Sequence, residues 1–243
     1  MAKIRVVGIG PGDYEEMTVR AVNALNACDV IVGYHVYVDL VKEHFSEKEF
    51  FTTPMRKEVD RCKIALDMAR QGRDVAMICS GDSGIYGMAG LIYELRGEDE
   101  SVEVEVIGGL TAACSGAGRL GAPLTHDFAV ISLSDLLTPW ETIEKRLDRA
   151  SDANFGIVLY NPGSMKRKDY LQRACDIVLR HQGPDTVCGI VRNIGREGEE
   201  AKVMTLRELR DYEPDMFTTV FIGNSFTKVI GGRMVTPRGY RDV

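Results

Sequence analysis

Short apolar runs alternate with longer amphipathic segments along the first half of the chain. Four runs rich in Val and Ile, each bounded by Gly or by charged residues, predict strands: residues 3–9, 29–33, 74–79 and 102–107. Apolar residues recur at three- and four-residue spacing in three further segments and predict helices: residues 18–28, 59–69 and 86–95. Because parallel strands need crossovers of this length, the pattern predicts a parallel α/β sheet.

A second alternation follows the Gly- and Ala-rich segment 111–120 and a proline-containing linker at 121–125. It predicts strands and helices in turn: strands at 128–133, 155–160, 186–191, 201–204 and 219–222, and helices at 139–150 and 168–181. Thr138 before Pro139, and Thr205 with Glu208 three residues later, have the pattern of helix N-caps. We therefore expect two α/β domains, residues 1–122 and residues 123–243.

Composition excludes several classes of protein. Lys and Arg total 30 against 36 Asp and Glu, so the net charge of −6 disfavours a nucleic-acid partner. Six cysteines form no Cys-x-x-Cys pair and four histidines are scattered, so no metal site is expected. The first residues do not resemble a signal peptide, and the longest interior uncharged stretch, residues 106–118, is too short to span a membrane. We expect a reduced, cytoplasmic protein without a membrane partner.

Ligands of open α/β sheets bind at the carboxyl ends of the strands, so the loops that follow strands carry the functional predictions. The loop at 8–13 resembles a dinucleotide-binding turn, but Asp13 stands where that motif has its third glycine, and no ribose-binding acid ends the next strand. A nucleotide-dependent oxidoreductase is therefore one hypothesis.

Four more loops expose backbone through small residues: 80–87, 108–113, 160–163 and 192–196. In the first of them, Asp82 either offers a charge to a ligand or only forms an Asx turn, in which Asn would serve equally well. Loops of both halves at the same ends of their sheets predict a ligand cleft between the domains.

The motifs together resemble those of the tetrapyrrole methylases, over essentially the whole chain. They are VGIGPGD at 7–13, GDSGIYG at 81–87, YNP at 160–162 and Gly223-Asn224. VGY at 32–34 and SLSDLLTPW at 132–140 are similar to the precorrin-3B C(17)-methyltransferase branch of cobalamin synthesis. Ser83, where the family usually has Pro, is similar to the cobalt-dependent form of that branch.

The resemblance implies a parallel-sheet N-terminal domain, a mixed-sheet C-terminal domain and S-adenosylmethionine (SAM) in the cleft between them, with S-adenosylhomocysteine (SAH) as product. The implied SAM contacts are Cys79, Ser80, Gly81, Asp82, Ser83, Ile85, Tyr86, Thr111, Ala112, Tyr160, Asn161, Arg192, Asn193, Thr218 and Thr219. It also implies a homodimer, a substrate tetrapyrrole that could carry cobalt, and a first glycine loop that faces the macrocycle.

In-line methyl transfer needs positioning more than a strong base, whereas ring contraction and lactone closure need proton movements. The ionisable candidates are Asp13, His126 and Asp135, supported by Ser134 and Thr138. Alternatively, His126 fixes the linker and Thr138 is only a helix cap. Other hypotheses are a same-fold methylase acting on another tetrapyrrole position, on a diphthamide precursor or on ribosomal RNA, and a binding module without catalysis.

Overall fold

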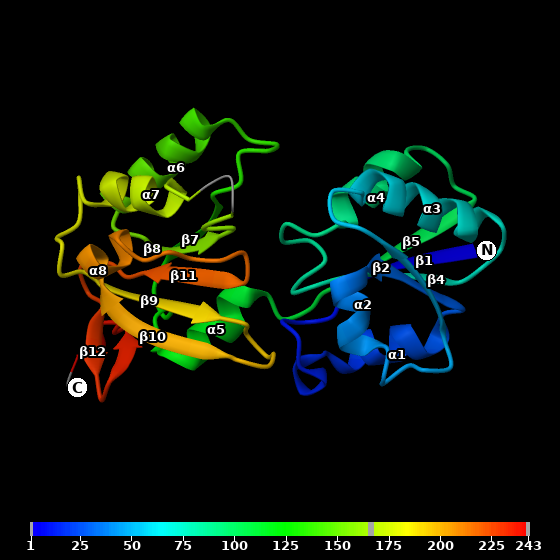
Figure 1. Ribbon diagram of the computed structural model, residues 1–243, viewed down its shortest axis with the longest axis horizontal. Coiled ribbons are helices and arrows are strands. Elements are labelled where there is room, and N and C mark those ends of the chain that lie inside the picture. Colours follow the sequence, from blue (N-terminus) through cyan, green and yellow to red (C-terminus); the bar gives the residue numbers. More distant parts are fainter. Residues whose placement is uncertain (1, 165–167, 242–243) are drawn as a thin grey trace. The chain divides into compact units, whose positions relative to one another are not determined.

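The chain divides into two compact units, Met1–Ala112 and Ala113–Val243, each with its own sheet (Figure 1). The computed structural model describes residues 2–164 and 168–241. The start of the second unit precedes the predicted boundary at 122 because helix α5 (Ala112–Leu120) packs on the second sheet. A Cβ on Gly116 of this helix would lie 2.8 Å from the Phe221 ring, and one on Gly189 would lie 2.8 Å from the Leu120 side chain.

The first unit is a five-stranded parallel sheet of order β3-β2-β4-β1-β5, which confirms the predicted parallel arrangement but has one strand more than the four predicted. Its strands are β1 (Ala2–Gly8), β2 (Val30–Tyr34), β3 (Glu49–Thr53), β4 (Val75–Cys79) and β5 (Val102–Ile107). Helices α3 (Glu58–Arg70) and α4 (Ala89–Arg96) cover one face, and α1 (Val19–Ala27) and α2 (His35–Val41) cover the other (Figure 1). An apolar core lies on each face of this sheet, and residues of β1 contribute to both. Ile4 and Val6 pack in the core beneath α3, and Val7 packs in the core beneath α1.

Two elements of this unit have weak sequence patterns and were not predicted. β3 is an edge strand whose residues are mostly exposed or half-buried, so it lacks the apolar run of a central strand. α2 has only seven residues. Helix α4 begins three residues after its predicted start because Tyr86 has a φ of 55°, in the left-handed region that a helix cannot include.

The second unit is a five-stranded mixed sheet of order β10-β9-β11-β8-β7. Its strands are β7 (Phe128–Ser132), β8 (Gly156–Tyr160), β9 (Val187–Arg192), β10 (Glu200–Thr205) and β11 (Thr218–Ile222). Among neighbouring strands of this sheet, only β7 and β8 pair in parallel, whereas β11 pairs antiparallel with both β8 and β9. Helices α6 (Trp140–Asp152), α7 (Tyr170–Val178) and α8 (Leu206–Arg210) bury one face of this sheet.

Smaller elements complete the chain: the 3-10 helix η1 (Tyr14–Glu16) and a second sheet of β6 (Gly121–Ala122), β12 (Lys228–Ile230) and β13 (Arg233–Val235). The predicted capping box at Thr205 and Glu208 is confirmed. The predicted Thr138 cap is wrong, because α6 begins at Trp140 and Pro139 occupies the cap position without a side-chain hydrogen bond.

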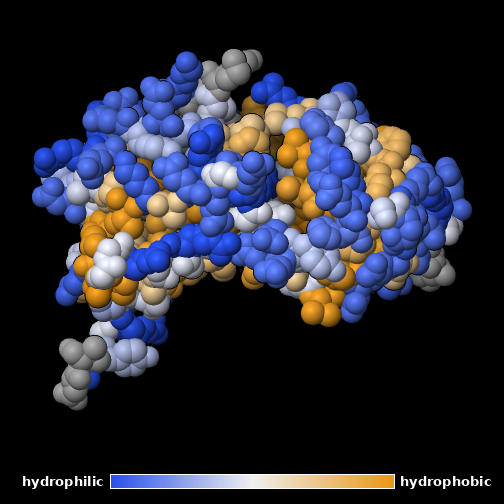
Figure 2. Space-filling view, turned by 60° about the horizontal axis from the view of Figure 1, so that its bottom comes forward, coloured by the Kyte–Doolittle hydropathy of each residue, from blue (hydrophilic) through white to orange (hydrophobic). Residues whose placement is uncertain are grey.

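Hydrophilic residues prevail on the face shown in Figure 2, with apolar residues gathered in smaller patches. Within residues 2–164 and 168–241, no helix combines the length and hydropathy that a bilayer crossing requires.

Candidate functional site

Three loops of the first unit meet at the carboxyl ends of β1, β4 and β5. The backbones of Gly10 and Gly81 exchange two hydrogen bonds, of 3.1 and 2.7 Å. A Cβ on Gly109 would lie 2.3 Å from the Gly81 carbonyl oxygen, and one on Gly8 would lie 2.7 Å from the Gly109 nitrogen. Glycine is therefore required at 8 and 109 by close approach of backbones.

Asp82 holds this cluster together with both oxygens of its carboxylate. Oδ1 accepts hydrogen bonds from the backbone N–H groups of Gly84 and Ile85, at 2.8 and 3.1 Å. Oδ2 accepts a third bond from the N–H of Gly109 at 3.0 Å. The side chain thus forms the expected Asx turn and also ties the loop after β4 to the loop after β5.

Ser83 adds a second link between the same strands. Its buried hydroxyl donates to the carbonyl of Ile107, the last residue of β5, at 2.9 Å. A proline at this position could not make that bond. Cys79, at the end of β4, is buried, and burial raises the pKa of its thiol to about 11, so it remains neutral.

Small and apolar groups remain at the surface of this cluster. Ile85 and Tyr86 are 41% and 54% exposed, and Leu110 is 41% exposed. Near Gly84, a Cβ would meet only Asp82 Oδ1, at 3.3 Å. A flat, partly apolar ligand could therefore approach the backbone here and cover these side chains.

The geometry does not support dinucleotide binding at residues 8–13. The N–H and C=O of Gly10 are both bonded to Gly81, and helix α1 begins only at Val19, after η1. A pyrophosphate site needs free N–H groups where the glycine turn enters a helix.

In the second unit, polar residues gather at the carboxyl ends of β7 and β8. The amide of Asn161, which has a φ of 54°, donates to the hydroxyl of Ser132 at 2.9 Å. The Tyr160 hydroxyl accepts a 2.7 Å bond from the N–H of Ala113, in the first turn of α5. These bonds position the loops after β7 and β8 relative to α5.

The antiparallel β11 brings its first residues to the same edge, since Thr218 pairs with Arg192 and Thr219 with Val191. Asp215 joins them: its Oδ2 accepts a 2.7 Å bond from Arg192 Nε, and its Oδ1 accepts a 2.7 Å bond from the Thr218 hydroxyl. Asn193, at a φ of 50°, follows Arg192 in the loop after β9.

Comparison with known proteins identifies the family. Residues 3–210 match the model of the Tetrapyrrole (Corrin/Porphyrin) Methylases. The chain belongs to this family, and it is a methyltransferase.

Relatives of the methylase cover its whole length. A probable cobalt-factor III C(17)-methyltransferase of Salmonella typhimurium is 47% identical over 98% of this chain and 99% of the relative. The cobalamin biosynthesis protein CbiHC of Archaeoglobus fulgidus is also 47% identical, but the match covers 53% of that longer protein. The crystal structure of the methyltransferase CobJ superposes with a TM-score of 0.90 at 34% identity, over 98% of this chain and 100% of that one.

In each unit of the methylase, the residues expected to contact SAM lie at the carboxyl-end edge of the sheet or in the loops at that edge. In the first unit these are residues 79–83, 85, 86, 111 and 112, and in the second they are residues 160, 161, 192, 193, 218 and 219. Their predicted contacts with SAM, and the predicted cleft between the units, stay predictions.

The candidate catalytic residues of the methylase are dispersed. Asp13 caps η1 by accepting a bond from the Glu15 N–H. His126 precedes β7 whereas Ser134 follows it, so a five-residue strand, about 17 Å long, separates them. The ring of His126 stacks on Phe226, with centroids 5.9 Å apart. The structure therefore does not bring His126 to the edge that carries the other second-unit candidates.

Asp135 lies in the loop after β7, close to Ser134 and Thr138 in sequence. Its Oδ2 accepts a 2.6 Å bond from the Tyr170 hydroxyl, and this bond raises the pKa of Tyr170. Tyr170 packs against Trp140, with ring centroids 4.6 Å apart. Sequence analysis missed Tyr170 and Asp215. Only the fold brings Tyr170 of α7 to the loop after β7, and Asp215, just before β11, to Arg192 at the end of β9.

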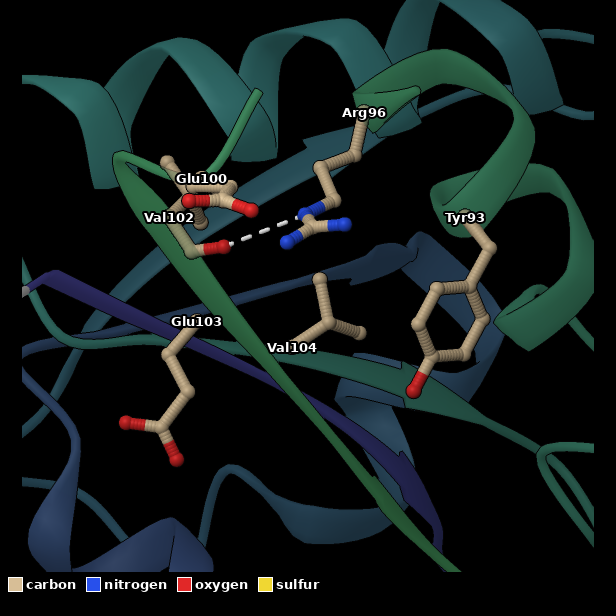
Figure 3. Close-up of a pocket in the computed structure, with 6 residues that line it drawn as sticks. All are labelled: Tyr93, Arg96, Glu100, Val102, Glu103 and Val104. Carbon is tan, nitrogen blue, oxygen red and sulfur yellow. Dashed lines mark hydrogen bonds between the residues drawn. The ribbon is translucent and has the colours of Figure 1, made fainter. Parts of the chain in front are cut away.

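A surface pocket of about 370 Å³ lies elsewhere in the first unit, between α4 and the start of β5 (Figure 3). Arg96 crosses it to donate a 3.3 Å bond to the Val102 carbonyl, beside Tyr93 and Glu100. Because it adjoins the amino end of β5, this pocket is separate from the loops that carry the site. Within residues 2–164 and 168–241, no group of three His, Cys, Asp or Glu side chains could hold a metal ion.

Proposed function

We propose that the methylase transfers a methyl group from SAM to carbon 17 of a cobalamin precursor, cobalt-factor III or precorrin-3B, with contraction of the ring. The observation that carries this proposal is the 47% identity, over 98% of the chain, to a relative named as a probable cobalt-factor III C(17)-methyltransferase. Relatives named as probable cobalt-factor III C(17)-methyltransferases, at 47% and 43% identity, favour the cobalt-containing substrate.

The residues of both sheet edges suit SAM. In the first unit, the open backbone near Gly84 and the exposed side chains of Ile85 and Leu110 offer a small-residue and apolar surface for adenine and ribose. In the second unit, Asn161 and Asn193 hold left-handed conformations that turn the chain sharply just after β8 and β9. SAM, when bound, supplies an electrophilic methyl carbon on its sulfonium.

The chain's own groups then contribute position more than acid–base strength. Asp82 and Ser83 fix the loop after β4, and the Tyr160 hydroxyl fixes the first turn of α5. Loops fixed in this way would hold SAM and its substrate in position for in-line attack without rearrangement of the protein. The Asp135 carboxylate, hydrogen-bonded to Tyr170, is the group we assign to the proton movements of contraction and lactone closure.

The test is incubation of the purified chain with labelled SAM and either cobalt-factor III or precorrin-3B, followed by mass spectrometry and carbon NMR. We expect one added methyl on carbon 17 and one equivalent of SAH. A methyl at another carbon would favour a different tetrapyrrole methylase. No transfer to either tetrapyrrole, but transfer to a diphthamide precursor or ribosomal RNA, would overturn the proposal.

The remaining predictions concern the setting of the enzyme. We propose that it works in the cytoplasm, where thiols stay reduced; its six cysteines are unpaired and five of them are buried. We also propose a homodimer with one SAM site per chain, which light scattering and calorimetry test directly.

A further inference from the structure

Arg61 is the only charged residue among the buried polar residues of the described chain. It lies in the first turn of α3 and is 4% exposed. Its Nε donates to the hydroxyl of Thr53 at 2.7 Å, and its Nη2 donates to the carbonyl of Pro54 at 3.2 Å. Both acceptors are neutral, and no carboxylate within the described residues forms an ion pair with Arg61.

A buried guanidinium without a counter-charge is costly, because burial removes the water that stabilises the cation. The nearest carboxylate in sequence, Asp60, is already paired with Lys57 at 2.9 Å. Arg73, in the same unit, has an ordinary partner, since it pairs with Glu49 at 2.6 Å. The Arg61 guanidinium can therefore pair with an anion from outside the chain, such as an anionic group of a ligand.

Arg61 also has the right location for a ligand. Thr53 is the last residue of β3 and Tyr34 the last of β2, so the guanidinium lies at the carboxyl-end edge of the parallel sheet. Its Cζ is 5.9 Å from the centre of the Tyr34 ring. Nη1 makes no hydrogen bond to a described residue and is not enclosed, so it can donate to a ligand at this edge.

We infer that Arg61 forms a carboxylate-binding subsite and that the carboxylate belongs to a side chain of the tetrapyrrole substrate. This inference rests on the proposed function. Guanidinium and carboxylate form charge-assisted hydrogen bonds, and the Thr53 and Pro54 bonds fix the guanidinium before substrate arrives. The amino-acid end of SAM carries the same chemical group, so the experiment must distinguish the two sources.

The experiment compares Arg61→Gln and Arg61→Lys with Arg73→Gln, a control at the opposite end of β3. For each variant we measure melting temperature, SAH affinity by calorimetry, tetrapyrrole binding by absorbance titration, and the KM and kcat of methyl transfer. For Arg61→Gln we expect the tetrapyrrole Kd and the KM to rise by about tenfold, with kcat and SAH affinity within about a factor of two. Arg61→Lys keeps the charge but loses the planar fork, so its KM rises by a smaller factor, about threefold. Arg73→Gln leaves every constant unchanged.

Unchanged tetrapyrrole Kd and KM in either folded Arg61 variant would overturn the subsite. If the affinity for SAH falls by the same factor as the KM rises, the carboxylate belongs to SAM, and the assignment to the substrate is overturned. If Arg61→Gln does not fold, Arg61→Lys decides alone by the same criteria. Absence of methyl transfer by the wild-type protein would contradict the proposed function, whereas the binding titration would still test Arg61.

Discussion

The carboxylate of Asp82 bonds to the backbone N–H of Gly109, 27 residues away, at 3.0 Å. The same side chain closes its own Asx turn through the other oxygen. A single residue therefore sets both the shape of the loop after β4 and its distance from the loop after β5.

Asp82→Asn should destabilise the protein, although Asn forms Asx turns as well as Asp does. An amide has one acceptor oxygen, so it can accept either the bond of the Asx turn or the bond from Gly109. The backbone N–H that loses its bond then faces the NH₂ group of the Asn side chain, which is itself a donor. We expect the free energy of unfolding to fall by about 1–3 kcal/mol. Urea denaturation measures the loss. Asp13→Asn is the control, because Asn can still accept the one bond from Glu15 N–H. Equal stability of wild type and Asp82→Asn would show that Oδ2 is dispensable.

Gly109→Ala should disrupt the loop cluster. The added Cβ would lie 2.3 Å from the Gly81 carbonyl oxygen and 2.6 Å from that of Gly8, and backbone atoms cannot rotate away. We expect a loss of about 2–3 kcal/mol in stability and weaker SAH binding. Gly118→Ala is the matched control: apart from the neighbouring backbone of its own helix, no atom would lie within 4 Å of the added Cβ, and in a helix the change should stabilise by about 0.5–1 kcal/mol. Thermal melts of the two variants should shift in opposite directions.

The loops of the site were predictable from sequence, but most of their bonds were not. Clusters of glycine after apolar runs mark places where backbones approach, and the structure brings 8–10, 81–84 and 108–109 together. The second oxygen of Asp82 finds its partner on another strand, and no local pattern encodes that pairing. The same holds for Asp215, which reaches Arg192 only because β11 runs antiparallel to β9.

The fold was predictable wherever strands are buried on both faces. All five residues of β4 are buried, and its apolar run is unmistakable. β3 has one buried residue, at its end, so its sequence lacks the apolar run that marks the central strands. The domain boundary depends on the packing of α5 against Phe221 and Gly189, which lie more than 65 residues further along the chain.

Asp215 should contribute to the acid sensitivity of the methylase. Burial alone would raise the pKa of this carboxyl. The hydrogen bonds from Thr218, Arg192 and the Phe217 N–H outweigh that effect, so the pKa lies below its ordinary value of 3.8. A group whose pKa is lower in the folded state stabilises the fold above its unfolded pKa, and this contribution is lost as pH falls through the folded pKa. We expect Asp215→Asn to be less stable than wild type at neutral pH and to lose less stability between about pH 4 and 3. Urea midpoints measured across that range test this. Asp185→Asn, at a side chain 85% exposed, should leave the wild-type slope unchanged.

Cys114 should report cofactor binding. It is the only exposed cysteine of the six and lies in the first turn of α5, two residues after Ala112. Burial raises the pKa of the thiols of Cys28 and Cys79 to about 11 and of Cys62 and Cys175 to about 12, so these react slowly near pH 8. A thiol reagent should therefore label one cysteine per native chain, and Cys114→Ser should abolish that labelling. If SAM contacts Thr111 and Ala112, saturating SAH should slow the labelling of Cys114 by roughly fivefold or more, because a bound ligand excludes the reagent. An unchanged labelling rate, under conditions where calorimetry shows SAH bound, would show that α5 does not contact the cofactor. The bond from Ala113 to the Tyr160 hydroxyl would then have no role in positioning the cofactor.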